Sequence, residues 1–520
     1  MSLDSQDAAA PSPAETARTS DRAETPLPWG QLSAILAVKL AEPVNLSLIQ
    51  PFMFEMVSSF DVVKSPKDVS FYAGVLFMSY SVCQATTSTY WGPLSDRIGR
   101  RPTVLICAAG DLITFVLFGL SKSFWWALAT RCLNGFFVGN GAVIKSATAE
   151  LADDTNRPRM MAMLPLIWHV GVMGGAAVGG LLANPAEQYP GVFGGVELFR
   201  TYPYLLPCLC GSLTTAFGLM AGVFWLRETL VRDPSDDAPA AEAGESTPAT
   251  EPTTPDTEST TPATESTALV ASMRRIGPKP AVVLMTPVAK RVILTTTLLC
   301  LVVIMMLQTY PIFAATPTSD GGLGFAPRSI GFSLAVAGIA VVYLQLVAYP
   351  RLERSLGALW CYRAGMLVMA PYFFAMPFLS YLAGHVERLA GDQARAAASP
   401  RLSQAGIEYA LLWVLLVALL LVRTVGDILA FTSGGLLVVN IAPSKTTLGA
   451  MTGIQQLMNT LMGIIGPLAS GTLWSWSIKH DLPYPLNAHL VWVLCGSLTL
   501  LTWKLSLKLP DSVNIFASGR

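Results

Sequence analysis

Six ionisable side chains lie inside long apolar stretches of this 520-residue sequence: Glu42, Asp111, Arg131, His169, Arg423 and Asp427. A charged group costs roughly 3 kcal/mol or more at the centre of a bilayer, so such a residue is expected to face a partner or a water-filled cavity. A carboxyl group in a cavity of low dielectric constant can pick up and release a proton. These residues are therefore candidates for proton coupling or substrate binding inside a membrane.

Glu42 and Asp111 are the candidate proton carriers. Glu42 lies three residues after Lys39, so the two side chains share one face of a helix and can pair. Asp111 lies midway along an apolar stretch, and we rank it level with Glu42 for protons and lower for substrate. His169, the one histidine deep in such a stretch, either titrates near neutral pH or is a hydrogen-bonded structural group.

The buried arginines have two interpretations each. Arg423 and Asp427 lie four residues apart, so they form an internal ion pair or contribute directly to substrate binding or coupling. Arg131 either forms a structural salt bridge or acts in a cavity. The eight cysteines have no metal-ligand spacing, so we expect packing roles for the thiols and no bound metal.

The composition indicates that lipid surrounds this chain. Hydrophobic residues make up 52% of the sequence, charged residues make up 13%, and the mean hydropathy is +0.50, whereas soluble domains carry about 25% charged residues. The net charge is zero, which gives no electrostatic footprint for nucleic acid. A membrane helix needs about 20 mostly apolar residues. Twelve such stretches begin near residues 31, 69, 103, 124, 160, 203, 290, 329, 359, 408, 447 and 488.

The twelve stretches fall into two groups of six. We expect an all-α polytopic membrane protein with six-helix bundles at 29–228 and 289–509. Residues 229–288 are acidic and rich in Ser, Thr and Pro, a composition typical of a disordered linker. Residues 1–28 lack the apolar core of a signal peptide, so we interpret them as a disordered cytosolic tail and 510–520 as a second tail.

Lys and Arg lie mainly on one side of the predicted membrane. The short loops assigned to the cytosol contain Arg97, Arg100, Arg101, Arg157, Arg159, Arg351, Arg354 and Lys445. The positive-inside rule then places both termini and the linker in the cytosol. The long loop predicted at 383–406 is an exception, because it carries several arginines and falls on the outside.

The two halves also resemble each other in sequence. WGPLSDRIG (91–99) aligns without gaps with YPRLERSLG (349–357). GGAAVGG aligns with IGPLASG, which pairs Gly180 with Gly471. Because these matches occur in the same order, the sequence predicts a duplicated transporter of six plus six helices.

The charged stretch between the second and third predicted helices carries a family pattern. The pattern G-x-x-x-D-x-x-G-R-R is matched by Gly92, Asp96, Gly99, Arg100 and Arg101, with Arg97 inside it. It resembles the signature of the major facilitator superfamily. The resemblance implies two pseudo-symmetric six-helix bundles around a central cavity. It also implies that this loop latches the two halves together in the outward-facing state.

Two further motifs narrow the resemblance. GVMGGAAVGG resembles the antiporter motif G-x-x-x-G-P-x-x-G-G, with Ala176 in place of proline and with matches at Gly171, Gly175, Gly179 and Gly180. A spacing of four residues places three of these glycines on one helix face that packs against a neighbour, and generic small-residue packing is the alternative interpretation. RCLNGFFVGNG is similar to the family pattern R-x-x-x-G-x-x-x-G, which implies that Arg131 tunes proton coupling.

The set of motifs resembles the twelve-span drug:proton antiporters, particularly fungal ones near the zinc-induced-facilitator-like group. The resemblance implies alternating access and proton-driven export of a small organic molecule, such as a secondary metabolite, toxin, drug or organic acid. We expect no cofactor and no direct use of ATP, because no P-loop pattern occurs. We also expect a monomer, in the plasma membrane rather than the vacuolar membrane.

Three other functions remain open at this point. A facilitator-type importer and a metal-chelate or zinc-related transporter share the same architecture. A polytopic membrane enzyme would need a catalytic cluster, and the four histidines are scattered along the chain. We therefore expect a transporter and not an enzyme.

Overall fold

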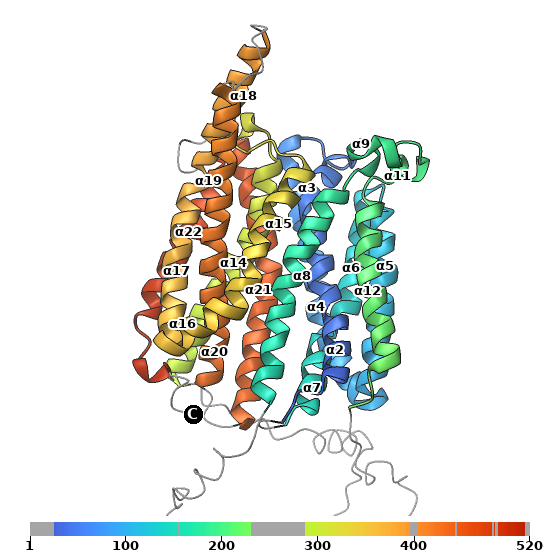
Figure 1. Ribbon diagram of the computed structural model, residues 1–520, viewed down its shortest axis with the longest axis vertical. Helices are drawn as coiled ribbons and strands as arrows, with labels where there is room; N and C mark the ends of the chain where they lie inside the picture. The colour runs from blue at the N-terminus through green and yellow to red at the C-terminus, as the bar shows by residue number, and fades with distance from the viewer. Residues whose placement is uncertain are drawn as a thin grey trace, which may run out of the picture.

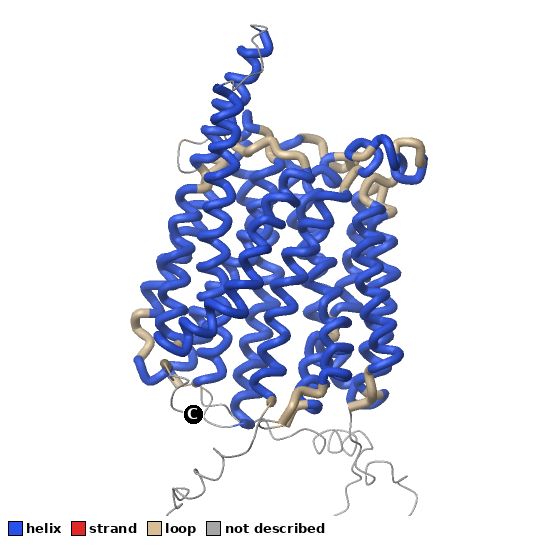
Figure 2. The backbone as a smooth tube through the Cα atoms, viewed as in Figure 1, coloured by secondary structure: helices blue, strands red, loops and turns tan. Residues whose placement is uncertain are grey.

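The computed structural model describes residues 25–153, 156–229, 286–395, 404–441, 445–480, 483 and 487–514. Every regular element in these ranges is helical, and the long helices run roughly side by side (Figures 1 and 2). The linker and the N-terminal tail predicted from composition fall almost entirely outside the described residues, whereas the C-terminal tail is described as far as Asn514 and begins with the short turn η5 (Asp511–Val513). The prediction of an all-α membrane protein is confirmed.

Six long helical segments make up the first half: α2 (Trp29–Leu48) with α3 (Gln50–Ser58), α4 (Val69–Ile98), α5 (Arg100–Gly119), α6 (Phe124–Val138) with α7 (Gly141–Leu151), α8 (Arg157–Leu182) and α12 (Leu205–Trp225). Short elements connect them: η1 (Pro66–Asp68), α9 (Pro185–Gln188), α10 (Pro190–Phe193) and α11 (Glu197–Thr201).

Six further segments make up the second half: α14 (Pro287–Ala315), α15 (Pro327–Tyr343) with α16 (Tyr349–Leu356), α17 (Ala358–Ala375) with α18 (Phe378–Arg395), α19 (Gln404–Asp427) with α20 (Ser433–Asn440), α21 (Lys445–Lys479) and α22 (Leu490–Ser506). The π-helical turns η3 (Leu344–Ala348) and η4 (Ile428–Thr432) interrupt two of them, and the short turns η2 (Thr318–Asp320) and η5 (Asp511–Val513) lie at their ends.

The twelve predicted helix starts all lie close to observed ones. The largest difference is at α19, which we predicted near residue 408 and which begins at Gln404. The outer loop predicted at 383–406 is wrong over its first part, because α18 continues as a helix to Arg395. Together α18 and α19 project beyond the rest of the molecule at the top of Figure 1.

Membrane-spanning character varies among these segments. Within the described residues, seven helices are long and apolar enough to cross a bilayer, α2 and α3 form an eighth span bent by 44°, and α22 is a shorter apolar helix. The helices α4 and α21 fall below this measure because many hydroxyl and amide side chains interrupt them. These two helices pack along each other between the halves, where polar side chains can avoid lipid.

We call the end where α4 meets α5 the inner end, and the end with η1 the outer end. At the outer end Lys479 pairs with Asp68 across the halves, and Lys67 Nζ donates to Ile478 O at 3.1 Å. On α4, residues 73–80 are mostly buried, whereas 81–90 are partly or fully exposed. The inner part of α21 is likewise more exposed than its outer part. The halves are therefore closed at the outer end and separate toward the inner end.

Candidate functional site

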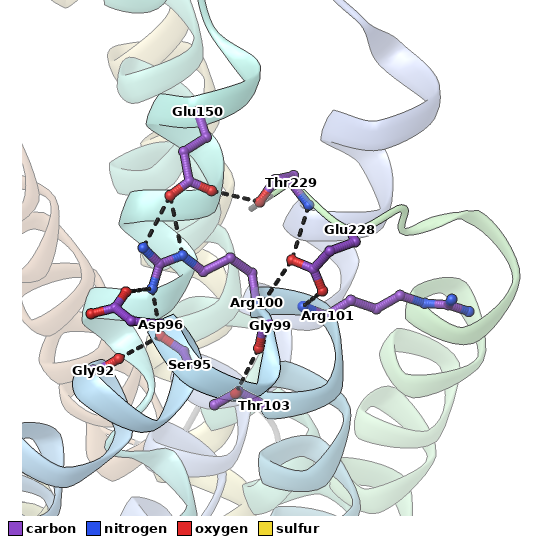
Figure 3. A network of polar contacts seen from close by, with 10 residues as sticks. All are labelled: Gly92, Ser95, Asp96, Gly99, Arg100, Arg101, Thr103, Glu150, Glu228 and Thr229. Atoms are coloured by element: carbon purple, nitrogen blue, oxygen red, sulfur yellow. Dashed lines mark hydrogen bonds and ion pairs between the residues drawn. The ribbon is translucent and has the colours of Figure 1, made fainter. Parts of the chain in front are cut away.

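The charged motif is not a loop but a sharp corner between two helices (Figure 3). Gly92, Asp96 and Arg97 belong to the last turns of α4, and α5 begins at Arg100. Gly99 alone makes the turn, with φ of +106°. Glycine is the residue that adopts this conformation without a steric penalty, which explains its place in the motif.

Arg100 joins three helices at this corner. Its Nη1 atom lies 2.6 Å from Asp96 Oδ1 and donates to Ser95 Oγ at 2.5 Å, both on α4. Its Nη2 atom lies 3.1 Å from Glu150 Oε1 on α7. Figure 3 shows the guanidinium between these partners. The arginine therefore fixes the inner ends of α4, α5 and α7 relative to one another.

A carboxylate caps the first turn of α5. Glu228, which follows α12, accepts hydrogen bonds from Arg100 N at 2.8 Å and Arg101 N at 3.1 Å. A carboxylate at a helix N-terminus satisfies free N–H groups and complements the helix dipole. The adjacent Thr229 donates to Glu150 Oε2 at 2.7 Å. The network thus also includes the segment after the sixth span.

These contacts of the motif hold the first half together. The partners of Arg100 and Arg101 described above all belong to the first half. The side chain of Asp96 is 61% exposed. The predicted latch between the halves concerns the outward-facing state, and this structure is closed at the opposite end. For Asp96 and its neighbours the latch stays a prediction.

The second half repeats the same corner. Gly357 turns between α16 and α17 with φ of +83°, at the position that the sequence alignment pairs with Gly99. Asn514 Oδ1 accepts from Leu359 N at 3.0 Å, so it caps α17 as Glu228 caps α5. Arg363 Nη2 donates to a carbonyl near the end of the twelfth segment, Leu509 O, at 3.1 Å. The two halves therefore share a structural repeat as well as a sequence one.

The glycine face of α8 packs against α2, as predicted. A Cβ atom at Gly171 would meet Pro43, and one at Gly175 would lie 2.9 Å from Val44 Cα. A Cβ atom at Gly179 would meet the backbone of Leu48. The three glycines thus let two helices of the first half approach closely.

Gly180 faces the other half. A Cβ atom placed there would lie 2.5 Å from Gly331 Cα on α15. A second crossing pairs Gly74 on α4 with Gly471 on α21, where a Cβ at Gly74 would lie 3.4 Å from Gly471 Cα. The sequence alignment pairs Gly180 with Gly471, so the two repeat-related glycines make equivalent contacts.

Asp111 lies at a junction of four helices and is 5% exposed. Its Oδ2 atom accepts from Asn45 Nδ2 at 3.0 Å and from Thr215 Oγ1 at 3.2 Å. Its Oδ1 atom accepts from Asn134 Nδ2 at 2.6 Å. These partners on α2, α12 and α6 are all neutral. They hold the carboxyl group without supplying a positive charge.

Arg131 is connected to Asp111 through Asn134. The arginine is 1% exposed, and its Nη1 atom donates to Asn134 Oδ1 at 3.4 Å. Its guanidinium lies 4.5 Å from the ring centroid of Tyr80 and 5.7 Å from that of Phe118, within cation–π range. Its Nε and Nη2 atoms have no hydrogen-bond partner among the described residues. Of the two interpretations of Arg131, the structural salt bridge is not found among the described residues, where an amide link and an aromatic cage hold the guanidinium instead.

Glu42 forms the predicted pair with Lys39. Gln84 Nε2 on α4 donates to Glu42 Oε1 at 3.1 Å. A small cavity of about 20 Å³ lies between Glu42 and Asp111, with Asn140 and Thr215 also on its wall. This is room for one water molecule. The two candidate proton carriers therefore line one small cavity, whose wall also includes apolar side chains such as Val38 and Phe137.

Lys145 is a site residue that the sequence analysis missed. It lies on α7, and its Nζ atom donates to Gln456 Oε1 on α21 at 2.6 Å, across the two halves. A fourth span of about 20 residues from position 124 would end before Lys145. The helix instead breaks at Gly139 and Asn140 and resumes as α7. The sequence signal that could have revealed Lys145 was this Gly-Asn-Gly segment followed by further apolar residues, which indicates that the helix continues after a break.

The remaining candidates lie apart from Asp111. His169 Nδ1 is 2.9 Å from Pro165 O, and its ring lies edge-on to Phe431 of the second half at 6.3 Å. The predicted pair of Arg423 and Asp427 is confirmed, with Nη2 4.0 Å from Oδ2. Within the described residues, no group of three His, Cys, Asp or Glu side chains has the arrangement of a metal site.

Comparisons with known proteins agree with this architecture. The family model for the Major Facilitator Superfamily matches residues 43–467. Protein ZINC INDUCED FACILITATOR 1 of Arabidopsis thaliana is 29% identical over 92% of this chain and 91% of its own length. The major facilitator superfamily multidrug transporter mfsB of Aspergillus fumigatus is 27% identical over 90% of this chain and 81% of its own. The crystal structure of a D-xylose-proton symporter superposes with a TM-score of 0.64 at 14% identity, covering 93% of this chain and 98% of the symporter.

Proposed function

The chain belongs to the major facilitator superfamily, and from that membership we propose that it is a proton-coupled exporter of a small organic molecule that works by alternating access. Membership makes it an integral, multi-pass membrane protein and a transporter rather than an enzyme. Beyond family membership we propose three things: a proton gradient drives transport, transport is directed out of the cell, and the substrate is a small organic molecule.

The observation that carries the proposal is the small cavity shared by Glu42 and Asp111. Both residues line it within the first half, and apolar side chains make up most of the rest of its wall. Glu42 also contacts Lys39 and Gln84, so its protonation changes the ion pair and the hydrogen bond at the face toward the second half. A proton that moves between Glu42 and Asp111 through one water would link the interior of the bundle to this face.

Alternating access is supported by the closed outer end. The pair of Asp68 and Lys479 is partly exposed, and such surface pairs contribute about 0–1 kcal/mol. The glycine crossings have no side chains to interlock. Apolar side chains of α3 and α8, among them Phe54 and Ala176, also pack on the second half. The ionic pair and the glycine crossings are the weak part of this closure, which suits a transporter that rocks between two states.

Export is favoured by two observations. The glycine face of α8 resembles the antiporter motif, and it packs on α2 as that motif requires. A fungal relative of nearly full coverage is named as a multidrug transporter. We further propose a monomer in the plasma membrane with cytosolic termini. In support of the last point, α2 begins beside the end of α12, where Gln31 Nε2 donates to Trp225 O at 2.8 Å.

A second candidate is a metal-chelate or zinc-related transporter. The name of the Arabidopsis relative, a zinc-induced facilitator, favours it. Such a protein would move a chelate as an organic molecule through the same space between the halves. Transport of radioactive zinc with and without an organic chelator distinguishes this candidate from export of a metal-free compound.

The proposal is tested by efflux from cells that express the full chain. Cells are loaded with a panel of anionic, neutral and cationic fluorescent dyes, and efflux is followed before and after a protonophore collapses the proton gradient. We expect efflux to stop on collapse, and E42Q and D111N to lose the gradient-dependent part. D320N, which alters a carboxylate on an outer connection, is the control and should behave as wild type. Efflux that continues after collapse would contradict proton coupling.

A further inference from the structure

Lys145 differs from the other charged side chains in the interior because its described partner is neutral. Lys39 and Glu42 form an ion pair, as do Arg423 and Asp427. Arg131 is connected to Asp111 only through the amide of Asn134. Lys145 has no carboxylate partner among the described residues and donates to an amide oxygen. No described carboxylate in contact with it therefore compensates its positive charge.

Lys145 lies at the interface between the two halves. It lies on α7 of the first half, and its side chain is exposed even though it reaches across to α21 of the second half. Its described partner is the neutral amide oxygen of Gln456. Its neighbour Ile144 lines the same small cavity as Lys39 and Glu42. An ammonium group in this position is accessible and is held by a partner that can be displaced.

The surroundings of Lys145 suit an organic molecule. Trp168 lies close to the pair of Lys39 and Glu42, because Lys39 Nζ is 5.9 Å from the centroid of the Trp168 ring. Phe431 and His169 meet edge to face across the two halves. On α21, Gln455 Nε2 donates to Asn459 Oδ1 at 2.7 Å one turn from Gln456. Both halves therefore contribute aromatic rings, and α21 contributes amide groups, in the part of the molecule where the halves face each other.

We propose that Lys145 binds the acidic group of the substrate, so that the transported molecule is an organic anion bearing a carboxylate or phosphate. This inference rests on the proposed export function and specifies its substrate class. On binding, the anion takes the place of Gln456 Oε1 on Lys145 Nζ, because an anionic oxygen adds direct charge–charge attraction to the hydrogen bond that the ammonium group donates. Displacing Gln456 also releases a contact between the halves.

The experiment uses the purified full chain in detergent and a matched set of probes. The set is 3-phenylpropionate, 2-phenylethyl phosphate, 3-phenylpropanamide and 3-phenylpropylammonium, which share a phenylalkyl body and differ in charge. A ligand that binds the folded protein raises its melting temperature in proportion to affinity. We expect the carboxylate and the phosphate to raise it, and the amide and the ammonium compound to leave it unchanged.

Three variants assign the effect to Lys145. K145Q should weaken the apparent affinity for the anions by at least about tenfold, because it removes the charged partner. K145R should retain most of the affinity for the anions. Q456E should lose this affinity as K145Q does, although Lys145 is intact, because the new carboxylate at position 456 pairs with the Lys145 ammonium group and competes with the anion. K504Q, at an exposed lysine in the last turn of α22, is the control and should bind as wild type.

The outcomes separate this inference from the export proposal. A shift for the ammonium compound equal to that for the anions, or an anion shift that survives in both K145Q and Q456E, overturns the anion site. If protonophore-sensitive efflux of a cationic dye persists in that case, export stands and only the substrate class is wrong. An anion shift that depends on Lys145 alongside efflux insensitive to the protonophore supports the site and contradicts proton coupling.

Discussion

Gly180 on α8 lies directly against Gly331 on α15, so close that a Cβ atom at position 331 would fall 2.6 Å from Gly180 Cα. Gly74 and Gly471 make the corresponding crossing between α4 and α21. Backbone therefore meets backbone at both crossings between the halves. With the ion pair of Asp68 and Lys479, these contacts close the outer end of the protein.

Replacing Gly331 by alanine should disturb this closure. The new methyl group would press on the backbone of α8, and overpacking of this kind costs about 1–3 kcal/mol. We expect a lower melting temperature and greater labelling of a cysteine at position 70, which contacts Gly471 at the outer end. G174A, on the same α8 but with nothing within 4 Å of the added Cβ, is the control. Equal behaviour of G331A and G174A would contradict a tight outer crossing.

The helix caps at the two inner corners should contribute comparably to stability. E228A leaves the N–H groups of Arg100 and Arg101 without their acceptor, and N514A does the same to Leu359. Loss of a cap costs about 0.5–2 kcal/mol, so both variants should melt at lower temperature than wild type. E197A, at an exposed glutamate on α11, should not. A loss in E228A alone would argue against the structural repeat of the corners.

Asn134 should be required for gradient-driven efflux. N134A leaves the buried Asp111 carboxyl with one donor fewer and removes the polar link to Arg131. An unsatisfied buried polar group costs about 1–3 kcal/mol, so the melting temperature should fall as efflux is lost. T130V is the matched control, because the Thr130 hydroxyl bonds only to carbonyls of its own helix. Normal gradient-driven efflux in N134A would exclude Arg131 and Asp111 as a coupled unit.

Features set by local spacing were predictable from the sequence. Helix starts follow from apolar stretches, and the pairs Lys39–Glu42 and Arg423–Asp427 follow from helical periodicity. The turn at Gly99 and the packing face of α8 follow from glycine spacing. Each depends on residues within one or two turns of a helix, so the pattern alone is sufficient.

Features that join distant segments were not predictable. The Asp111 junction draws partners from α2, α6 and α12, and no spacing in the sequence brings Asn45 and Thr215 together. Lys145 was missed as a site residue because the break before α7 hides the continuation of the span. The contact between Arg100 and Glu150 and the capping of α5 by Glu228 also join distant segments. Both depend on how the ends of the helices converge.

The most direct test of the account measures two distances in one preparation. Pulsed electron resonance on spin labels at positions 64 and 480, which are exposed and leave the pair of Asp68 and Lys479 intact, reports the outer end. Labels at 89 and 453, both exposed on α4 and α21, report the inner end. The measurement is made in lipid at about pH 5 and about pH 8, a range in which buried carboxyl groups can change protonation. The account predicts that the outer distance lengthens as the inner one shortens. Two distances that stay fixed, or that change in the same direction, would contradict proton-coupled alternating access.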